Sequence, residues 1–166
     1  MTVKIFNRSG QSAGKTSNSS IGYYLSGFAD GEGSFNISLV SRKQDYKKGW
    51  KVAPSFNVSQ RDDTVPILFM NFLQCGKIRY RKDGVCYFEV RNINDLCQKV
   101  LPFFKKYPLL SKDKKDVFKK FSKIILLMKR KKHLEKEGMK EILEIREKIK
   151  VKRKRKYSKE EILETY

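Results

Sequence analysis

The sequence predicts an α+β domain in which helices and β-hairpins follow one another in the order α-ββ-α-ββ-α. Apolar residues recur at helical spacing in several segments, and between these segments lie strictly alternating runs that come in pairs joined by polar turns. The 166 residues suit one domain. We expect it over 20–150, between a flexible basic N-terminal arm (1–19) and a basic C-terminal tail (151–166).

The first helix and hairpin are expected over 21–60. Ser19 and Ser20 offer N-caps for a helix over 21–30, and the glycines of 31–33 end it. Strands over 34–42 and 50–60 each carry apolar side chains on one face and polar side chains on the other. Pro54 within the second strand indicates an edge position or a bulge.

The second helix–hairpin unit and the final helices follow. We expect a helix over 64–74 and strands over 77–81 and 85–91, joined by an Asp-Gly turn that is typical of hairpins. A helix over 94–106 ends at a break enforced by Pro108, and a long helix over 112–131 has an apolar stripe. The remaining residues are helical in pattern and very basic.

The charge balance indicates the class of partner. Lys and Arg number 38 and Asp and Glu 18, which gives a net charge of +20 and favours a polyanionic partner. No apolar run approaches the roughly 18 residues of a membrane span. The three cysteines form no CxxC pair, so neither a disulfide framework nor a zinc knuckle is expected. The basic, serine-rich residues 1–19 also suit an organellar targeting segment.

The polar face of the two hairpins is expected to stay exposed, because the helices can cover the apolar face. An exposed sheet face with long polar donors can contact base edges and phosphates in the major groove of DNA. It can also be an ordinary solvated face, since charged strands are common in antiparallel sheets. The net charge favours nucleic acid.

The segment 25–34 (LSGFADGEGS) carries the strongest chemical signal. Gly27 and Gly31 lie four residues apart on one helix face, so a second helix could approach closely. Carboxylates at the carboxyl end of a helix meet the negative end of its dipole, and a divalent cation would offset this repulsion. Glu32 and the carbonyl group of Gly31 offer hard oxygen ligands for Mg²⁺. The alternative is a glycine-rich helix end with a surface acid.

Residues 25–33 resemble the LAGLIDADG motif of homing endonucleases, with Ser26 in the place usually held by alanine. The resemblance continues through the first strand, the order of elements and the segment 107–112 (YPLLSK), and covers about 21–131. It implies a saddle-shaped, four-stranded antiparallel sheet with helices on one face. A single motif implies a homodimer whose motif helices pack through Gly27 and Gly31.

The resemblance further implies a site-specific endonuclease that binds a long, near-palindromic double-stranded DNA site and hydrolyses one phosphodiester in each strand. Metal ligation falls on Glu32 and Gly31, with Mg²⁺ as the cofactor and Mn²⁺ or Ca²⁺ as other occupants. Gln60 matches a position that orders solvent, and Lys112 matches an active-site lysine, with Lys114 as its competitor. Asp30 is expected to be a helix-end or interface group.

DNA reading is expected from polar-face side chains of the four strands. Arg suits guanine, Asn adenine, and Glu can accept a hydrogen bond from cytosine. The candidates are Asn36, Ser38, Val40, Arg42, Lys51, Ser55, Asn57, Arg79, Arg81, Tyr87, Glu89 and Arg91. An intron RNA maturase, a catalytically silent DNA-binding protein and a ribosomal or chromatin-like basic protein are the alternatives. We favour a chloroplast or mitochondrial location over a prokaryotic cytoplasm.

Overall fold

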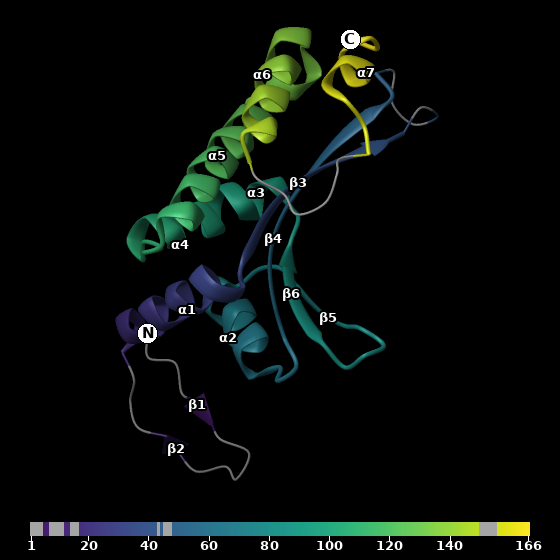
Figure 1. Ribbon diagram of the computed structural model, residues 1–166. Helices are drawn as coiled ribbons and strands as arrows, with labels where there is room; N and C mark the ends of the chain where they lie inside the picture. The colour runs from purple at the N-terminus through teal and green to yellow at the C-terminus, as the bar shows by residue number, and fades with distance from the viewer. Residues whose placement is uncertain (1–4, 7–11, 14–16, 43, 45–47, 150–155) are drawn as a thin grey trace.

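The computed structural model describes residues 5–6, 12–13, 17–42, 44, 48–149 and 156–166 (Figure 1). It confirms the expected order of two helix–hairpin units followed by helices. The elements of these units are α1 (Asn18–Glu32), β3 (Ser34–Ser41), β4 (Trp50–Gln60), α2 (Thr64–Leu73), β5 (Lys77–Tyr80) and β6 (Cys86–Val90). Before them, β1 (Ile5–Phe6) pairs with β2 (Ser12–Ala13). Most of the expected N-terminal arm lies outside the described residues.

The helices after β6 are more divided than expected. The segment expected as one helix consists of α3 (Ile93–Asp95), a π-helical turn (Leu96–Val100) and α4 (Leu101–Lys106). Pro102 near the start of α4 cannot donate a hydrogen bond to the preceding turn, where the helix widens. The remaining helices are α5 (Lys112–Lys129), a 3-10 turn (Lys132–Leu134), α6 (Lys136–Glu147) and α7 (Lys159–Leu163).

The boundaries of α1 differ from the expected 21–30. The N-cap is Ser17, whose hydroxyl accepts a hydrogen bond from the backbone N–H of Ser20 at 3.2 Å, so the helix starts earlier. At the other end, Gly31 and Glu32 remain helical. The helix ends where the N–H of Gly33 bonds to the carbonyl of Ala29 at 2.9 Å. Glu32 is therefore the last helical residue rather than part of a turn.

Four antiparallel strands form the sheet in the order β3-β4-β6-β5. Within β4, the residues that pair with β6 are Phe56–Gln60. Among the described strands, the first half of β4 therefore pairs with β3 alone. Pro54 lies in this half, opposite Ile37, which confirms the expected edge position. In an antiparallel pair, hydrogen-bonded and non-hydrogen-bonded residue pairs alternate along the strands. Because the Arg42 N–H donates to the Gly49 carbonyl, Ile37 and Pro54 form a non-hydrogen-bonded pair. The Pro54 nitrogen therefore faces away from β3, toward the open edge of β4.

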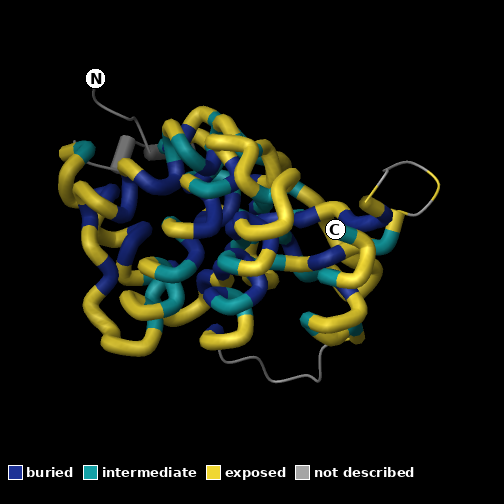
Figure 2. Tube along the Cα trace, turned by 90° about the horizontal axis from the view of Figure 1, so that it is seen from above, coloured by how far each residue is buried: buried dark blue, intermediate teal, exposed yellow. Residues whose placement is uncertain are grey.

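Helices α1, α2, α4 and α5 cover one face of the sheet, and the main core lies between these layers (Figures 1 and 2). Aromatic rings fill much of it. Phe35 stacks on Phe56 at 5.1 Å between ring centroids and also contacts Phe104, Phe118 and Phe121. This core confirms the expected apolar faces of both hairpins, and it holds α1 firmly against the sheet.

A second core cluster, which we call the outer cluster, supports the far ends of β3 and β4. It contains Leu39, Trp50, Val52, Ile124, Met128, Met139, Ile142, Leu143, Ile145, Ile149 and Ile162. Tyr157 packs on the Trp50 ring at 4.7 Å, and Ile162 of α7 is fully buried. The described part of the segment expected as a C-terminal tail, residues 156–166, is thus packed against the domain.

The cysteines and the lengths of the helices complete the description of the fold. Cys75, Cys86 and Cys97 all carry free thiols. None of the described helices combines the length and the apolar composition that are needed to cross a lipid bilayer.

The tight packing of α1 generates a stability prediction. A Cβ atom at Gly22 would lie 2.3 Å from the buried Tyr107 ring, whereas a Cβ atom at Gly27 of the same helix would meet nothing within 4 Å. We expect Gly22→Ala to lower the free energy of unfolding by about 1–3 kcal/mol. Gly27→Ala, the matched control, should leave it unchanged or raise it by up to about 1 kcal/mol. Urea unfolding at low protein concentration measures both, and an unchanged Gly22→Ala midpoint would contradict the packing.

Candidate nucleic-acid interface and acidic turn

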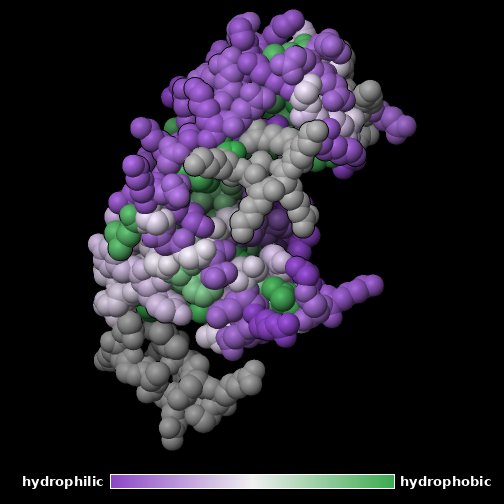
Figure 3. Space-filling model, in the orientation of Figure 1, coloured by the Kyte–Doolittle hydropathy of each residue, from purple (hydrophilic) through white to green (hydrophobic). Residues whose placement is uncertain are grey.

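The polar face of the sheet carries most of the side chains that the sequence predicts to read DNA. Arg42, Arg81 and Arg91, expected within strands, lie one residue beyond the ends of β3, β5 and β6. Along β3 and β4 the residues of this face are exposed or half-buried, while their neighbours in the strands are mostly buried. The register places Asn36 opposite Ser55, Val40 opposite Lys51 and Asn57 opposite Glu89. Figure 3 shows a crescent-shaped molecule with hydrophilic residues along both arms. This face of β3 and β4 is thus mostly polar, with Val40 and Ala53 among its residues.

The β5–β6 hairpin holds its arginines through internal contacts. Glu89 lies 2.9 Å from Arg91 and 3.8 Å from Arg79, measured from carboxylate oxygen to Nε. Arg81, in the turn after β5, donates to the Tyr87 hydroxyl at 2.9 Å and pairs with Asp83. The sequence predicts these arginines as separate DNA contacts, and their partners within the hairpin become visible only in the structure.

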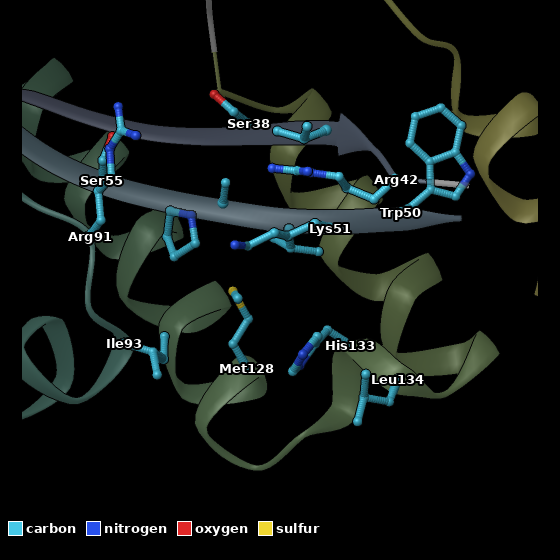
Figure 4. Close-up of a pocket in the computed structure, with 14 residues that line it drawn as sticks. Ser38, Arg42, Trp50, Lys51, Ser55, Arg91, Ile93, Met128, His133 and Leu134 are labelled. Carbon is cyan, nitrogen blue, oxygen red and sulfur yellow. The ribbon is translucent and has the colours of Figure 1, made fainter. Parts of the chain in front are cut away.

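A groove runs along the open edge of β4 and extends the polar face (Figure 4). Its volume is about 600 Å³. Arg42 and Lys51 line it from the strands, and Met128, His133 and Leu134 line it from the end of α5 and the following turn. Burial lowers the pKa of His133. No sequence pattern marks this histidine, because only the fold brings the turn beside the strand.

Glu32 is the acid at the last position of α1. It is exposed, and the last turn of α1 contains no basic residue. Within the described residues, no three side chains of His, Cys, Asp or Glu come together to hold a metal ion. The hard oxygen donors of Glu32 and the Gly31 carbonyl fit Mg²⁺ chemically, but this chain supplies one carboxylate of such a site. A complete site needs further ligands from outside these residues.

The open face of α1 adjoins this acid. A Cβ atom added at Gly27 or Gly31 would meet nothing within 4 Å, so both positions border open space. Large side chains next to them are also exposed: Tyr23 by 59%, Tyr24 by 55% and Leu110 by 77%. A helix face with small residues at its centre and apolar residues around it suits the approach of another helix.

Gln60 and the two candidate lysines lie at the same end of the domain as Glu32. Gln60 is exposed at the last position of β4, three residues beyond the Asn57 that pairs with the first residue of β3. Lys112 is exposed at the first position of α5. Lys114 donates a hydrogen bond from Nζ to the Gly33 carbonyl at 2.6 Å. The structure thus ties Lys114 directly to the acidic turn, while Lys112 stays free of any described contact there.

Asp30 joins the end of α1 to the start of α5. Its carboxylate accepts hydrogen bonds from the N–H groups of Leu110 (2.9 Å) and Ser111 (2.8 Å) and from the Ser111 hydroxyl (2.6 Å). Burial opposes the charged form, but these hydrogen bonds outweigh it and lower the pKa of Asp30. The carboxylate, unfavourable at the carboxyl end of α1, is thus stabilised at the amino end of α5. This agrees with the expected helix-end role.

Ser26 adds a second contact between the same segments. Its hydroxyl is buried and donates to the Tyr107 carbonyl at 2.8 Å. Ser26, Asp30 and Gly33 therefore all bond to residues 107–114, while Gly27 and Gly31 remain open. The hydroxyl that replaces the usual alanine methyl has a specific partner, so this substitution is compatible with close packing.

Much of the chain matches a known protein family. The family model described as LAGLIDADG endonuclease matches residues 25–125. Curated relatives include "DNA endonuclease I-CeuI" of Chlamydomonas moewusii, 33% identical over 88 residues, which are 51% of this chain and 40% of the relative. "Probable intron-encoded DNA endonuclease 1" of Mycosarcoma maydis is 32% identical over 84 residues, 49% of this chain and 29% of the relative. The chain spans between 18% and 52% of the length of the curated relatives that it matches.

Solved structures share the fold. The homing endonuclease I-TnaI is 34% identical with a TM-score of 0.72, over 87% of this chain and 94% of that chain. The LAGLIDADG homing endonuclease I-LtrWI, solved bound to target DNA, is 29% identical with a TM-score of 0.76, over 81% of this chain and 46% of that chain. These similarities confirm the expected α+β fold with a four-stranded antiparallel sheet.

The Asp30 contacts generate a pH-dependent prediction. Asp30→Ala removes the acceptor for two backbone N–H groups, and we expect it to lower the free energy of unfolding by about 1–2 kcal/mol at pH 7. Because the folded pKa is lowered, this stabilisation is present above the ordinary value of 3.8 and is lost as pH falls through the folded pKa. Urea unfolding of both proteins from pH 7 to pH 2 measures it. A constant difference at every pH would show that the carboxylate charge is not involved.

Proposed function

The chain belongs to the LAGLIDADG endonuclease family, and on this basis we propose that it is a site-specific homing endonuclease that cleaves double-stranded DNA. The observation that carries the proposal is the position of Glu32. This exposed carboxylate lies at the foot of a helix with an open glycine face, next to the polar face of a four-stranded sheet. Family, fold and site chemistry agree on phosphodiester hydrolysis.

Double-stranded DNA is the proposed substrate. The net charge of +20 supplies long-range attraction to the phosphate backbone. The polar face carries arginine and asparagine side chains, which pair well with guanine and adenine edges in the major groove. A relative of the same fold, I-LtrWI, was solved bound to its target DNA. These observations favour DNA over the alternatives of intron RNA and non-specific polyanion binding.

We propose that the active form is a homodimer. The given sequence contains one LAGLIDADG-like motif and thus one acidic turn of this kind, at Glu32. Cutting two strands requires two acidic sites near a common axis. The open face around Gly27 and Gly31 is the surface through which two copies of α1 would pack. A two-fold protein of this kind would bind a near-palindromic site.

The cleavage residues are assigned by their chemistry and position. Glu32 and the Gly31 carbonyl would hold the divalent cation, Mg²⁺ or in its place Mn²⁺ or Ca²⁺, and a second copy would complete the ligand set. When bound, Mg²⁺ lowers the pKa of water and stabilises charge on the leaving oxygen. Gln60 would orient the attacking water, and Lys112 or Lys114 would stabilise the charge on the phosphate.

The relatives also bear on where the protein acts. Several are named as intron-encoded endonucleases, including those of Mycosarcoma maydis and Neurospora crassa. We infer that this chain is likewise encoded within an intron and acts in an organelle. Its target would then be the intron-free copy of the host gene.

The first test of the proposal removes the charge of Glu32. We expect Glu32→Gln to abolish cleavage in Mg²⁺, because a neutral amide is a poor ligand for a hard cation. DNA affinity should change by no more than about 0.5 kcal/mol, since Glu32 is exposed and is not among the strand side chains proposed to read bases. Gel assays of cleavage and binding measure the two effects separately.

Glu137→Gln on α6 is the matched control, because it neutralises another exposed acid far along the chain. It should cut as the wild type does. Cleavage by Glu32→Gln at the wild-type rate would refute the assignment of Glu32 to the metal.

The second test addresses the dimer. We expect Gly27→Leu to prevent dimerisation, because a leucine there would fill the space that a second helix needs, while the monomer has room for it. Lys119→Leu, which adds an exposed leucine on α5, is the control and should leave association unchanged. Sedimentation velocity reports the oligomeric state. A monomeric Gly27→Leu variant that still cuts both strands would contradict the symmetric arrangement.

A further inference from the structure

We infer that Glu89 is a positioning residue for DNA specificity: it orients Arg79 and Arg91 for base reading and does not itself contact a base. This inference rests on the proposed function, in which the polar face of the sheet reads DNA. It differs from the expectation drawn from the sequence, which placed Glu89 among the side chains that read bases directly.

The position of Glu89 in the sheet is the first argument. Glu89 lies in the middle strand β6, opposite Asn57 of β4 on one side and Lys77 of β5 on the other. Its side chain is on the polar face, yet it is only 13% exposed, while those of Arg79 and Arg91 are 57% and 63% exposed. An approaching DNA duplex therefore meets the arginines before it meets the carboxylate.

The contacts of the carboxylate are the second argument. One oxygen, Oε1, lies 2.9 Å from Nε of Arg91, and the other, Oε2, lies 3.8 Å from Nε of Arg79. Among the contacts of the described residues, both arginines meet Glu89 through Nε. This leaves the terminal Nη1 and Nη2 of each guanidinium for the bidentate pairing that recognises guanine.

Electrostatics is the third argument. An acid on a surface that receives phosphates would repel them if it were unpaired. Between two arginines, Glu89 is neutralised and the group keeps a net positive charge. A cytosine amino group would have to compete with these two cations for the carboxylate oxygens. Holding the arginines in place also reduces the side-chain freedom that they lose on binding DNA.

A cavity that borders these side chains is the fourth argument. A cavity of about 280 Å³ is lined by Glu89, Arg79 and Arg91 together with Lys77, Asn92 and Asp95. The two arginines therefore border open volume, into which a base edge can enter. The arrangement has the form of a reading site that is already oriented before DNA arrives.

The experiment selects bound duplexes from a randomised library with the full-length wild type and its variants, without relying on cleavage. Arg79→Ala and Arg91→Ala each identify the symmetric pair of base positions that the arginine reads. We expect Glu89→Gln to lower the preference at both of these pairs, by about tenfold at each. Affinity for non-specific DNA should hold or rise, because a negative charge is removed.

Several outcomes would overturn the inference. In one such outcome, Glu89→Gln changes the preference at a third pair of base positions, where the wild type prefers cytosine, and leaves the preferences at the two pairs read by the arginines intact. Glu89 would then read a base directly. Unchanged preferences in Glu89→Gln, or in both arginine variants, would overturn it as well. If the wild type selects no sequence at all, the proposed function itself fails, and that result is distinct from the others.

Two controls separate orientation from general damage. Asp83→Asn removes the acid beside Arg81 in the same hairpin and should leave the Arg79 and Arg91 positions unchanged. Glu89→Thr, a residue well suited to strands, provides a second variant if the glutamine variant folds poorly. Each Glu89 variant that folds is expected to lose preference at the two pairs, and a folded variant that keeps both preferences would contradict a role for the carboxylate.

Discussion

The hydrogen bonds between the end of α1 and the segment before α5 determine where every group of the acidic turn lies. Ser26, Asp30 and Gly33 each bond to a residue about 80 positions further along the chain. They bring the start of α5, with Lys112 and Lys114, beside the foot of α1. These contacts occupy one face of the helix, and the adjoining face with Gly27 and Gly31 remains open. The same helix is thus fixed inside its own domain and available to a second one.

The two acids of the motif illustrate how position assigns different roles to similar groups. The Asp30 carboxylate accepts three internal hydrogen bonds that stabilise its charge, so few of its acceptor sites remain for a cation. Glu32, two residues later, points from the last helical position and is exposed. An acid that keeps the fold together and an acid that is free for chemistry are thus separated by a rotation of about 200° around one helix.

Local patterns of sequence were sufficient for much of the fold, and long-range contacts account for what they missed. Alternation along β3 and β4 predicted the exposed and buried faces, and Pro54 predicted the open edge. By contrast, the pairing of Asp30 with Ser111 and the packing of Tyr157 on Trp50 join residues far apart in the sequence, with no periodic signal. The partners of Glu89 became visible only with the strand register, since Arg79 lies in another strand.

The existence of two separate core clusters has an evolutionary consequence. The main core supports the motif helix and the acidic turn, while the outer cluster of α5, α6 and α7 supports the far ends of β3 and β4. Substitutions in regions that share few partners combine almost independently. Under the proposed function, side chains at the far ends of β3 and β4 can therefore change together with DNA preference, while the acidic turn remains under separate selection.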